Sequence, residues 1–323
     1  MSVTLDDIRA AARQLEGHVI RTPLVPAPRL SEMLGSEVHL KLENHQYTGS
    51  FKDRGAFVKL SSLSDAQKKT GVIAMSAGNH AQGVAYHAQR LGIPATIVMP
   101  ETAPFTKVER TRGFGARVVQ SGETIDEAAT AARELMDAEG LTFVHPYDDE
   151  RIIAGQGTIG LELLEDLPSV ETTLVPLSGG GLIAGIAVAL KAADPAIRVV
   201  GISMERGPAM YESLRAGKPV PVEEQASLAD SLGGGIGLDN RYTFPLVRDL
   251  VDEVVLVGES EIAAGMTRLY RAERLVTEGA AAVGVAALMS GRVRVGSGPV
   301  ATIVSGCNVD MDTFTRVVTG DET

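Results

Sequence analysis

The stretch Tyr47-Thr48-Gly49-Ser50-Phe51-Lys52-Asp53-Arg54-Gly55-Ala56 decides the fold. It follows residues 38–43, whose apolar residues alternate with the period of a strand, and it precedes a helical pattern that runs through Leu60. Lys52 is therefore expected at a helix N-terminus, where free backbone N–H groups and the helix dipole favour an anion. A lysine in that place is suited to losing its charge. By itself, however, it is better read as a solvated surface lysine, and only the rest of the chain favours the functional reading.

Strand-like and helix-like segments alternate regularly beyond Lys52. Strands are expected at residues 71–75, 95–99, 116–119, 141–144, 172–177, 198–202, 253–257 and 300–304. Helices are expected at 79–91, 106–113, 125–139 and 158–167, and from Leu182 onward. Nearly continuous apolar strands joined by helices predict parallel sheets that are covered on both faces. The fold class is therefore α/β.

A length of 323 residues exceeds the roughly 250–300 at which a single core stops growing, so two doubly wound sheet domains are predicted. In such folds ligands bind at the carboxyl ends of the strands, which puts the site in the cleft between the two domains. The N-terminal segment 3–15 has helical spacing, with Thr4 or Asp6 as N-cap. The prolines of residues 21–28 favour an extended crossing.

Composition excludes several classes of function. The net charge of −11, without a run of Lys and Arg, argues against a nucleic-acid partner. The single cysteine, Cys307, excludes an internal disulfide and a cysteine-based zinc site. No apolar run is long enough to cross a bilayer, and the N-terminus is acidic. We therefore expect a cytoplasmic enzyme without a membrane partner.

Two glycine-containing turns follow expected strands. In the first, Ser76-Ala77-Gly78-Asn79-His80, backbone N–H groups, a hydroxyl and an amide precede a helix and can hold a carboxylate. The alternative is a plain N-cap by Ser76 or Asn79. The second, Ser178-Gly179-Gly180-Gly181-Leu182, can form a phosphate nest. It has neither a nucleotide P-loop nor a dinucleotide fingerprint, which disfavours a nicotinamide dehydrogenase.

A third turn, Val304-Ser305-Gly306-Cys307-Asn308, places the Ser305 hydroxyl at the end of the last expected strand. Ser305 can meet a neutral ring nitrogen, or it can cap the last helix. One cofactor, pyridoxal 5′-phosphate, accounts for a lysine, a phosphate nest and a lone hydroxyl in separate turns. A serine beside the pyridine nitrogen leaves that nitrogen largely neutral, and the weaker electron sink favours loss of a β-leaving group over transamination.

These turns resemble motifs of the serine/threonine dehydratase and serine racemase family of tryptophan-synthase-β-like enzymes. The resemblance covers nearly the whole chain and rests on Lys41–Asn44, Thr48–Ala56, Ser76–Gly83, His145–Asp148, Gly155–Thr158, Gly179–Leu182 and Ser305–Asn308. It implies a pyridoxal-phosphate enzyme with a large cofactor domain of residues 1–52 and 146–323 and a small domain of residues 53–145. It also implies a homodimer.

By the same resemblance, Lys52 is the catalytic lysine that forms the Schiff base. The cofactor would be contacted by Phe51, Asn79, Gly179, Gly180, Gly181, Leu182 and Ser305. The substrate carboxylate would be bound in the turn of Ser76, Ala77, Asn79 and His80.

Two departures from the family pattern narrow the function. In the racemases a serine that acts on the face opposite the lysine stands where this chain has Ala77, and racemisation needs an acid or base on both faces. Elimination of water is therefore favoured over the racemase alternative. The family's divalent-cation ligands fall on Ser203 and Ala209, so no metal is expected unless Glu205 supplies a ligand.

Residues 203–210 and 229–237 resemble the hydroxyectoine-utilisation dehydratase branch. The expected substrate is a β-hydroxy-α-amino acid, either like L-threonine or L-serine or the ring-opened form of hydroxyectoine. Glu205 and Arg206 are candidate selectors of the substrate, with a solvated charge pair as the alternative. A third possibility is a pyridoxal-phosphate or amino-acid binding module that has no turnover.

Overall fold

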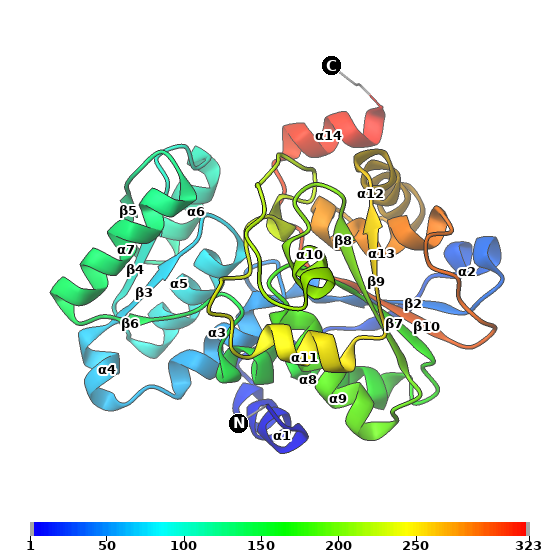
Figure 1. The fold of residues 1–323 in the computed structure, drawn as a ribbon, viewed down its shortest axis with the longest axis horizontal. Coiled ribbons are helices and arrows are strands. Elements are labelled where there is room, and N and C mark those ends of the chain that lie inside the picture. Colours follow the sequence, from blue (N-terminus) through cyan, green and yellow to red (C-terminus); the bar gives the residue numbers. More distant parts are fainter. Residues whose placement is uncertain (1–2, 321–323) are drawn as a thin grey trace.

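Two β-sheets organise the chain in the computed structural model, which describes residues 3–320 (Figure 1). The larger sheet has six strands in the order β1-β2-β10-β7-β8-β9. Its strands are β1 (Leu24–Pro26), β2 (Val38–Leu42), β7 (Thr172–Pro176), β8 (Arg198–Met204), β9 (Glu253–Val257) and β10 (Val300–Val304). All neighbours are parallel except β1 and β2. The proline-rich stretch that was expected to be extended therefore supplies an antiparallel edge strand.

The smaller sheet has four parallel strands in the order β5-β4-β3-β6. They are β3 (Val72–Met75), β4 (Ala95–Met99), β5 (Arg117–Gln120) and β6 (Thr142–Phe143). The helices around this sheet are α3 (Lys52–Ser61), α4 (Asp65–Thr70), α5 (Asn79–Leu91), α6 (Phe105–Gly113) and α7 (Ile125–Glu139). Figure 1 shows this part beside the larger sheet.

Helices cover both faces of the larger sheet. They are α1 (Leu5–Leu15), α2 (Pro28–Leu34), α8 (Glu150–Asp166), α9 (Gly181–Ala193), α10 (Ala209–Ala216), α11 (Thr243–Leu250), α12 (Glu259–Glu273), α13 (Gly279–Met289) and α14 (Met311–Thr319), with short 3-10 turns η1 (Glu43–His45) and η2 (Asp230–Leu232). Val175 packs in the core formed with α8 and α9, whereas its neighbour Leu174 packs in the core formed with α12 and α13. The alternation expected of a strand between two helical layers is present, and the predicted α/β class with doubly wound sheets is confirmed.

Glycines let three helices approach closely beneath the site. A Cβ on Gly185 of α9 would overlap the carbonyl of Ile153 and lie 2.5 Å from the amide nitrogen of Gly157 on α8. A Cβ on Gly155 of α8 would lie 2.7 Å from the Cα of Gly55 on α3. Side chains would force these backbones apart. The stack of α3, α8 and α9 therefore joins the helix that begins at Lys52 to the helix that follows the glycine turn.

Two local expectations are corrected by the structure. Helix α8 begins at Glu150, well before the expected residue 158, because the Asp149 side chain caps it by accepting from the amides of Arg151 and Ile152. Its glycines look like turn residues in the sequence but face neighbouring helices. The alternative role of Ser305 as the last N-cap is also wrong, because Asp310 caps α14.

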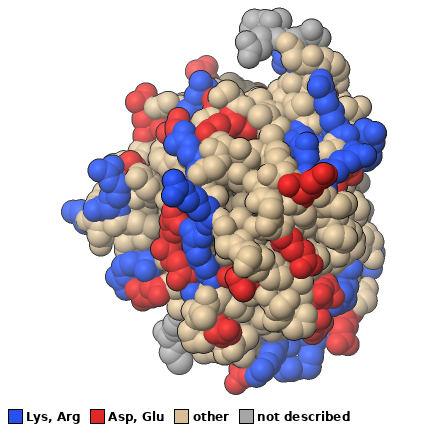
Figure 2. All heavy atoms as spheres, turned by 90° about the vertical axis from the view of Figure 1, so that its right-hand side faces the viewer, with Lys and Arg blue, Asp and Glu red and all other residues tan. Residues whose placement is uncertain are grey.

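The surface of the molecule carries charges of both signs (Figure 2). On the face drawn in Figure 2, acidic and basic side chains are interspersed around a broad uncharged area. Within residues 3–320, no helix combines the length and apolar character needed to traverse a bilayer. The domain boundaries at 52/53 and 145/146, like the absence of a nucleic-acid partner, stay predictions.

Candidate active site

A cleft of about 450 Å³ lies where the strands of both sheets end. The turns after β3, β7 and β10 all reach it, because parallel strands bring their carboxyl ends to one edge. The residues that the sequence assigned to catalysis, to the cofactor and to the substrate carboxylate all line this cleft: Phe51, Lys52, Ser76, Ala77, Asn79, His80, Gly179, Gly180, Gly181, Leu182 and Ser305. The roles of these residues one by one stay predictions.

Lys52 is held inside the cleft at the first position of α3. Its ammonium Nζ donates to the carbonyl oxygen of Pro146 at 2.7 Å. Burial lowers the pKa of Lys52 to about 8, while the nearby Glu278 acts in the opposite direction. The reading of Lys52 as a solvated surface lysine is therefore wrong. A lysine with this pKa is about one-tenth neutral at pH 7, far more than a lysine with an ordinary pKa.

The turn of Ser76 to His80 connects β3 to α5. Gly78 occupies the N-cap position without a side-chain cap, so neither Ser76 nor Asn79 is the N-cap that the sequence allowed as an alternative. Both ends of the Asn79 amide are already held, since Oδ1 accepts from Asn308 at 2.7 Å and Nδ2 donates to Glu278. The amide of Asn79 is thus presented in one orientation.

His80 is a neutral part of this lining. Its ring nitrogen Nε2 donates to the carbonyl oxygen of Val144 at 2.8 Å. Burial, assisted by the charge of Lys52, lowers the pKa of His80 to about 3. His80 therefore contributes shape and a fixed hydrogen bond rather than a proton.

The glycine turn is shaped by a tyrosine. A Cβ on Gly179 would overlap the ring of Tyr147, and a Cβ on Gly181 would lie 3.0 Å from the Tyr147 backbone. Gly180 has φ +91°, which side-chain-bearing residues rarely adopt. The Tyr147 hydroxyl in turn donates to the carbonyl oxygen of Gly235, which also lines the cleft, at 3.0 Å. The result is a bare backbone cradle at the N-terminus of α9.

Ser305 lies directly beside the lysine turn. Its carbonyl oxygen accepts from the amide of Phe51 at 3.0 Å, and Ser50 forms an isolated β-bridge with Gly306. The side chain of Ser305 is buried at the end of β10. Two turns that are about 250 residues apart in the sequence are therefore in contact.

These residues fit pyridoxal phosphate. The glycine turn Gly179–Gly181 presents the backbone amides at the N-terminus of α9 to a phosphate, with no side chains in the way. Lys52 supplies a partly neutral amine, and Ser305, from the turn after β10, supplies a hydroxyl. The three chemical groups open onto one cavity, as the predicted cofactor requires.

Several residues of the cleft have no recognisable motif in the sequence, and Glu278 is the most important of them. Only 2 % of Glu278 is exposed, and burial raises the pKa of its carboxyl to about 7. In the sequence it precedes a run of small apolar residues and looks like an ordinary helix start. Lys107 and Asp230 also line the cleft and form an ion pair of 2.8 Å. No motif in the sequence indicated that pair.

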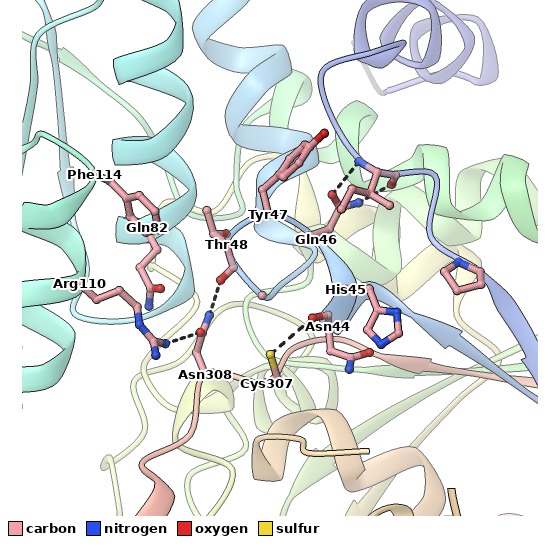
Figure 3. Close-up of a pocket in the computed structure, with 13 residues that line it drawn as sticks. Asn44, His45, Gln46, Tyr47, Thr48, Gln82, Arg110, Phe114, Cys307 and Asn308 are labelled. Atoms are coloured by element: carbon pink, nitrogen blue, oxygen red, sulfur yellow. Dashed lines mark hydrogen bonds between the residues drawn. The ribbon is translucent and has the colours of Figure 1, made fainter. Parts of the chain in front are cut away.

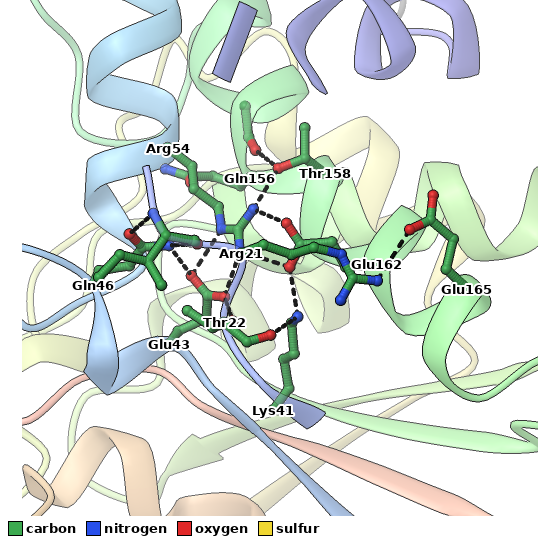
Figure 4. A network of polar contacts seen from close by, with 12 residues as sticks. Arg21, Thr22, Lys41, Glu43, Gln46, Arg54, Gln156, Thr158, Glu162 and Glu165 are labelled. Atoms are coloured by element: carbon green, nitrogen blue, oxygen red, sulfur yellow. Dashed lines mark hydrogen bonds and ion pairs between the residues drawn. The ribbon is translucent and has the colours of Figure 1, made fainter. Parts of the chain in front are cut away.

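A buried ionic network holds α3 against the neighbouring elements η1 and α8 (Figure 4). Arg54 donates Nε and Nη2 to the two carboxylate oxygens of Glu43, both at 2.8 Å. It also donates Nη1 and Nη2 to Glu162 at 2.6 and 2.9 Å, and Lys41 contacts Glu162 at 2.5 Å. The network thus connects β2, η1 and α8 to the second residue after Lys52.

A second cavity of about 670 Å³ lies next to the lysine turn (Figure 3). Arg110 and Cys307 are in its wall, and Asn308 accepts from Arg110 at 2.7 Å. The same Asn308 side chain donates to the Thr48 carbonyl at 2.8 Å and to Asn79. Cys307 is partly buried, and its thiol lies 3.4 Å from the carbonyl oxygen of Asn44. Burial raises the pKa of this thiol.

The positions considered for a cation and for substrate selection lie elsewhere. Ser203 is buried in β8, and Glu205 pairs with Arg292 at 3.2 Å. In the described part of the chain, no group of three or more His, Cys, Asp or Glu side chains is arranged to hold a metal ion. Glu205 and Arg206 are exposed and do not line the described cleft, which favours their alternative reading as surface charges.

Comparison with known proteins identifies the family. The family described as pyridoxal-phosphate dependent enzyme matches residues 15–306. The chain belongs to this family. The cofactor predicted from Lys52, the glycine turn and Ser305 is thereby confirmed.

Two relatives with similar sequences are named as L-threonine ammonia-lyase or dehydratase. An L-threonine ammonia-lyase of Thermotoga maritima is 48% identical over 98% of this chain and 78% of its own length. A catabolic L-threonine dehydratase of Escherichia coli strain K12 is 44% identical over 98% of this chain and 96% of its own length. The predicted membership of the dehydratase and racemase family is confirmed.

Solved structures show the same fold. Maize serine racemase superposes with a TM-score of 0.93 at 35% identity, over 99% of this chain and 98% of that one. The processed form of threonine deaminase isoform 2 from Solanum lycopersicum has a TM-score of 0.91 at 37% identity, over 98% and 88%. The fold is thus shared by racemases and deaminases, and the residues of the cleft must distinguish between the two activities.

Proposed function

We propose that this enzyme is a pyridoxal-phosphate-dependent dehydratase that removes water from a β-hydroxy-α-amino acid and releases an oxo acid and ammonia. The observation that carries this proposal is the meeting of Lys52, the Gly179–Gly181 cradle and Ser305 in one cleft. The ammonia-lyase and dehydratase names of relatives at 44–48% identity support the same reaction.

The residues of the cleft have separate roles in this reaction. The cofactor supplies an electron sink that makes the Cα proton of a bound amino acid acidic. Lys52, whose pKa of about 8 leaves part of it neutral, takes that proton onto Nζ. The amides of Gly179–Gly181 would hold the cofactor phosphate, and Ser305 would face the ring nitrogen. The turn of Ser76 to His80 would orient the substrate carboxylate at the N-terminus of α5.

Ala77 favours elimination over racemisation. It lines the cleft where the racemases carry a proton-donating serine, and a methyl group can neither give nor take a proton. The side chain at this position therefore cannot return a proton to the second face of Cα. The reaction that these side chains permit is elimination, in which the Cα proton and the β-hydroxyl group together leave as water.

The substrate is proposed to extend beyond L-threonine and L-serine to ring-opened hydroxyectoine. Its acetylated form carries a free α-amine and a hydroxyl β to the carboxylate, as this elimination requires. Residues 229–237, whose sequence suggested that substrate, include Asp230 to Gly235, which line the cleft. We further propose that the enzyme acts in the cytoplasm, since a single cysteine fits a reducing compartment, and that it is a homodimer, which the resemblance to the family implies.

A substrate screen with a lysine variant tests the function. The purified enzyme, supplied with pyridoxal phosphate, is incubated with L-threonine, L-serine, 3-hydroxyaspartate and ring-opened hydroxyectoine. Ammonia and oxo-acid release are expected from at least one, and Lys52→Ala should abolish both this release and the visible absorbance of the lysine-bound cofactor. Turnover by Lys52→Ala without added amine would overturn the proposal. A cofactor band without ammonia from any substrate would favour the binding-module alternative.

A further inference from the structure

Glu278 is a buried carboxylate that the roles assigned so far leave without a function. It lies directly before α13 and lines the cleft together with Lys52. Both of its carboxylate oxygens accept from Nδ2 of Asn79, at 2.8 and 3.1 Å. Its own backbone amide donates to the carbonyl oxygen of Gly306 at 3.2 Å. The side chain is thus fixed between the turn that follows β3 and the turn that follows β10.

Glu278 ends a hydrogen-bonded chain whose direction is determined at both termini. Arg110, which can only donate, donates to Oδ1 of Asn308, and Nδ2 of Asn308 donates to Oδ1 of Asn79. Nδ2 of Asn79 must then point to Glu278. A guanidinium at one end and a carboxylate at the other leave each amide a single favourable orientation. Asn79 cannot turn without breaking contacts at both of its ends.

The charges around Glu278 come from several elements. Asp230 of η2 raises the pKa of the Glu278 carboxyl, whereas Lys107 of α6 lowers it. Asn79 of α5 and the backbone amide of Asn308 also lower it by hydrogen bonding, but burial dominates and the pKa is about 7. In return, ionised Glu278 raises the pKa of Lys52 and of the Cys307 thiol. The carboxylate is therefore coupled electrostatically to the lysine of the site.

We propose that Glu278 is a positioning residue that fixes the Asn79 amide and holds a proton on Nζ of Lys52. Its negative charge favours the protonated form of that nitrogen, because the carboxylate and the ammonium group line the same cleft. This effect on the protonation of Lys52 requires ionised Glu278, so it is present at pH above about 7. It is lost as the pH falls and Glu278 becomes neutral. This inference rests on the proposed role of Lys52.

The test measures the protonation of Lys52 directly. The full-length chain, stripped of cofactor, is acetylated with a trace of acetic anhydride between pH 5.5 and 9, and the Lys52 peptide is quantified by mass spectrometry. Glu278→Gln keeps an acceptor for Asn79 but removes the charge, so the pKa of Lys52 should fall. Labelling should become about threefold faster at pH 7.5, while the two curves converge below pH 6.

Matched variants make the outcome specific. Glu278→Asp keeps the charge and should give Lys52 labelling close to that of the unsubstituted chain. Glu224→Gln removes an exposed carboxylate of the same cleft and should leave Lys52 labelling unchanged. Unchanged Lys52 labelling in Glu278→Gln would overturn the inference. If that variant does not fold, the unsubstituted chain decides: its Lys52 labelling curve must show a second inflection near pH 7.

The holoenzyme gives a second readout and separates this inference from the proposed function. With cofactor bound, the visible absorbance of Glu278→Gln should titrate at lower pH than that of the unsubstituted enzyme. Identical titrations combined with normal ammonia release by the unsubstituted enzyme would refute the role of Glu278 alone. Absence of a cofactor band and of ammonia release in the unsubstituted enzyme would instead refute the proposed function.

Discussion

At the scale of single residues, the chemistry of the cleft depends on which side chains can exchange a proton. Lys52 can, because burial brings its pKa to about 8, whereas burial and the charge of Lys52 keep His80 neutral. Ala77 cannot exchange a proton at all. One side-chain base near Cα is sufficient for elimination but not for inversion.

Ala77→Ser should therefore add an inverting activity. A hydroxyl at this position gives the second face of Cα a proton donor, and we expect formation of the opposite enantiomer from L-serine to rise by about 100-fold over the unsubstituted enzyme. Chiral chromatography, with deuterium incorporation from D₂O, measures this product.

The control is Ala66→Ser, because Ala66 is an exposed alanine of α4 outside the described cleft. An Ala77→Ser enzyme that still gives only oxo acid and ammonia would show that Ala77 does not decide between the two reactions.

The sequence predicted residues of the site well where a turn had a recognisable composition. The three glycines and Ser305 directly follow strands, and parallel topology brings such strand ends together, while Lys52 begins the helix that follows β2 and η1. Glu278 and the Lys107–Asp230 pair escaped prediction because their function depends on burial and on partners distant in the sequence. A lone glutamate before a helix has no local feature that distinguishes it from a solvated helix start.

At the scale of elements, close helix packing sets the position of the site. Most strands and helices were predictable from apolar periodicity, but the start of α8 was not, because Gly155 and Gly157 resemble turn residues in the sequence. Their actual function is to let α8 approach α3 and α9. This is a tertiary requirement, and periodicity along one segment cannot show it.

Gly185→Ala should test this packing. The added methyl group would overlap the carbonyl of Ile153, and the backbone of α8 cannot yield as a flexible side chain would. We expect a loss of about 3 kcal/mol in the free energy of unfolding, measured by urea denaturation.

Gly113→Ala is the matched control, since a Cβ on Gly113, at the end of α6, meets no atom within 4 Å. It should range from neutral to a gain of about 1 kcal/mol. Equal stability of the two alanine variants would contradict the packing argument.

At the scale of the whole molecule, contacts between segments that are distant in the sequence hold the two sheets together around one cleft. The Arg54 network joins β2 and α8 of the larger part to α3, which carries Lys52 (Figure 4). Arg54 is 1% exposed, so its two carboxylate partners depend on it for compensation of their charge. The sequence showed Arg54 as part of a motif but did not indicate this network.

Arg54→Lys should therefore be costly although it keeps the charge. A lysine cannot reproduce the two forked contacts with Glu43 and Glu162, and we expect a loss of about 3 kcal/mol in the free energy of unfolding. Arg21→Lys provides the comparison, because Arg21 pairs with Glu165 and Asp166 but is 52% exposed. That change should cost less than about 1 kcal/mol. Similar losses for both variants in urea denaturation would argue against a special role of the buried network.

The proposed activity depends on Lys52 being the lysine that binds the cofactor. The most direct measurement is borohydride reduction of the enzyme loaded with pyridoxal phosphate, followed by peptide mass spectrometry. Two lysines line the cleft, Lys52 and Lys107, so the result discriminates between real alternatives. We predict that the pyridoxyl-phosphate group is found on Lys52 and is absent from Lys52→Ala. Its stoichiometric presence on Lys107, or on any other lysine, would contradict the account.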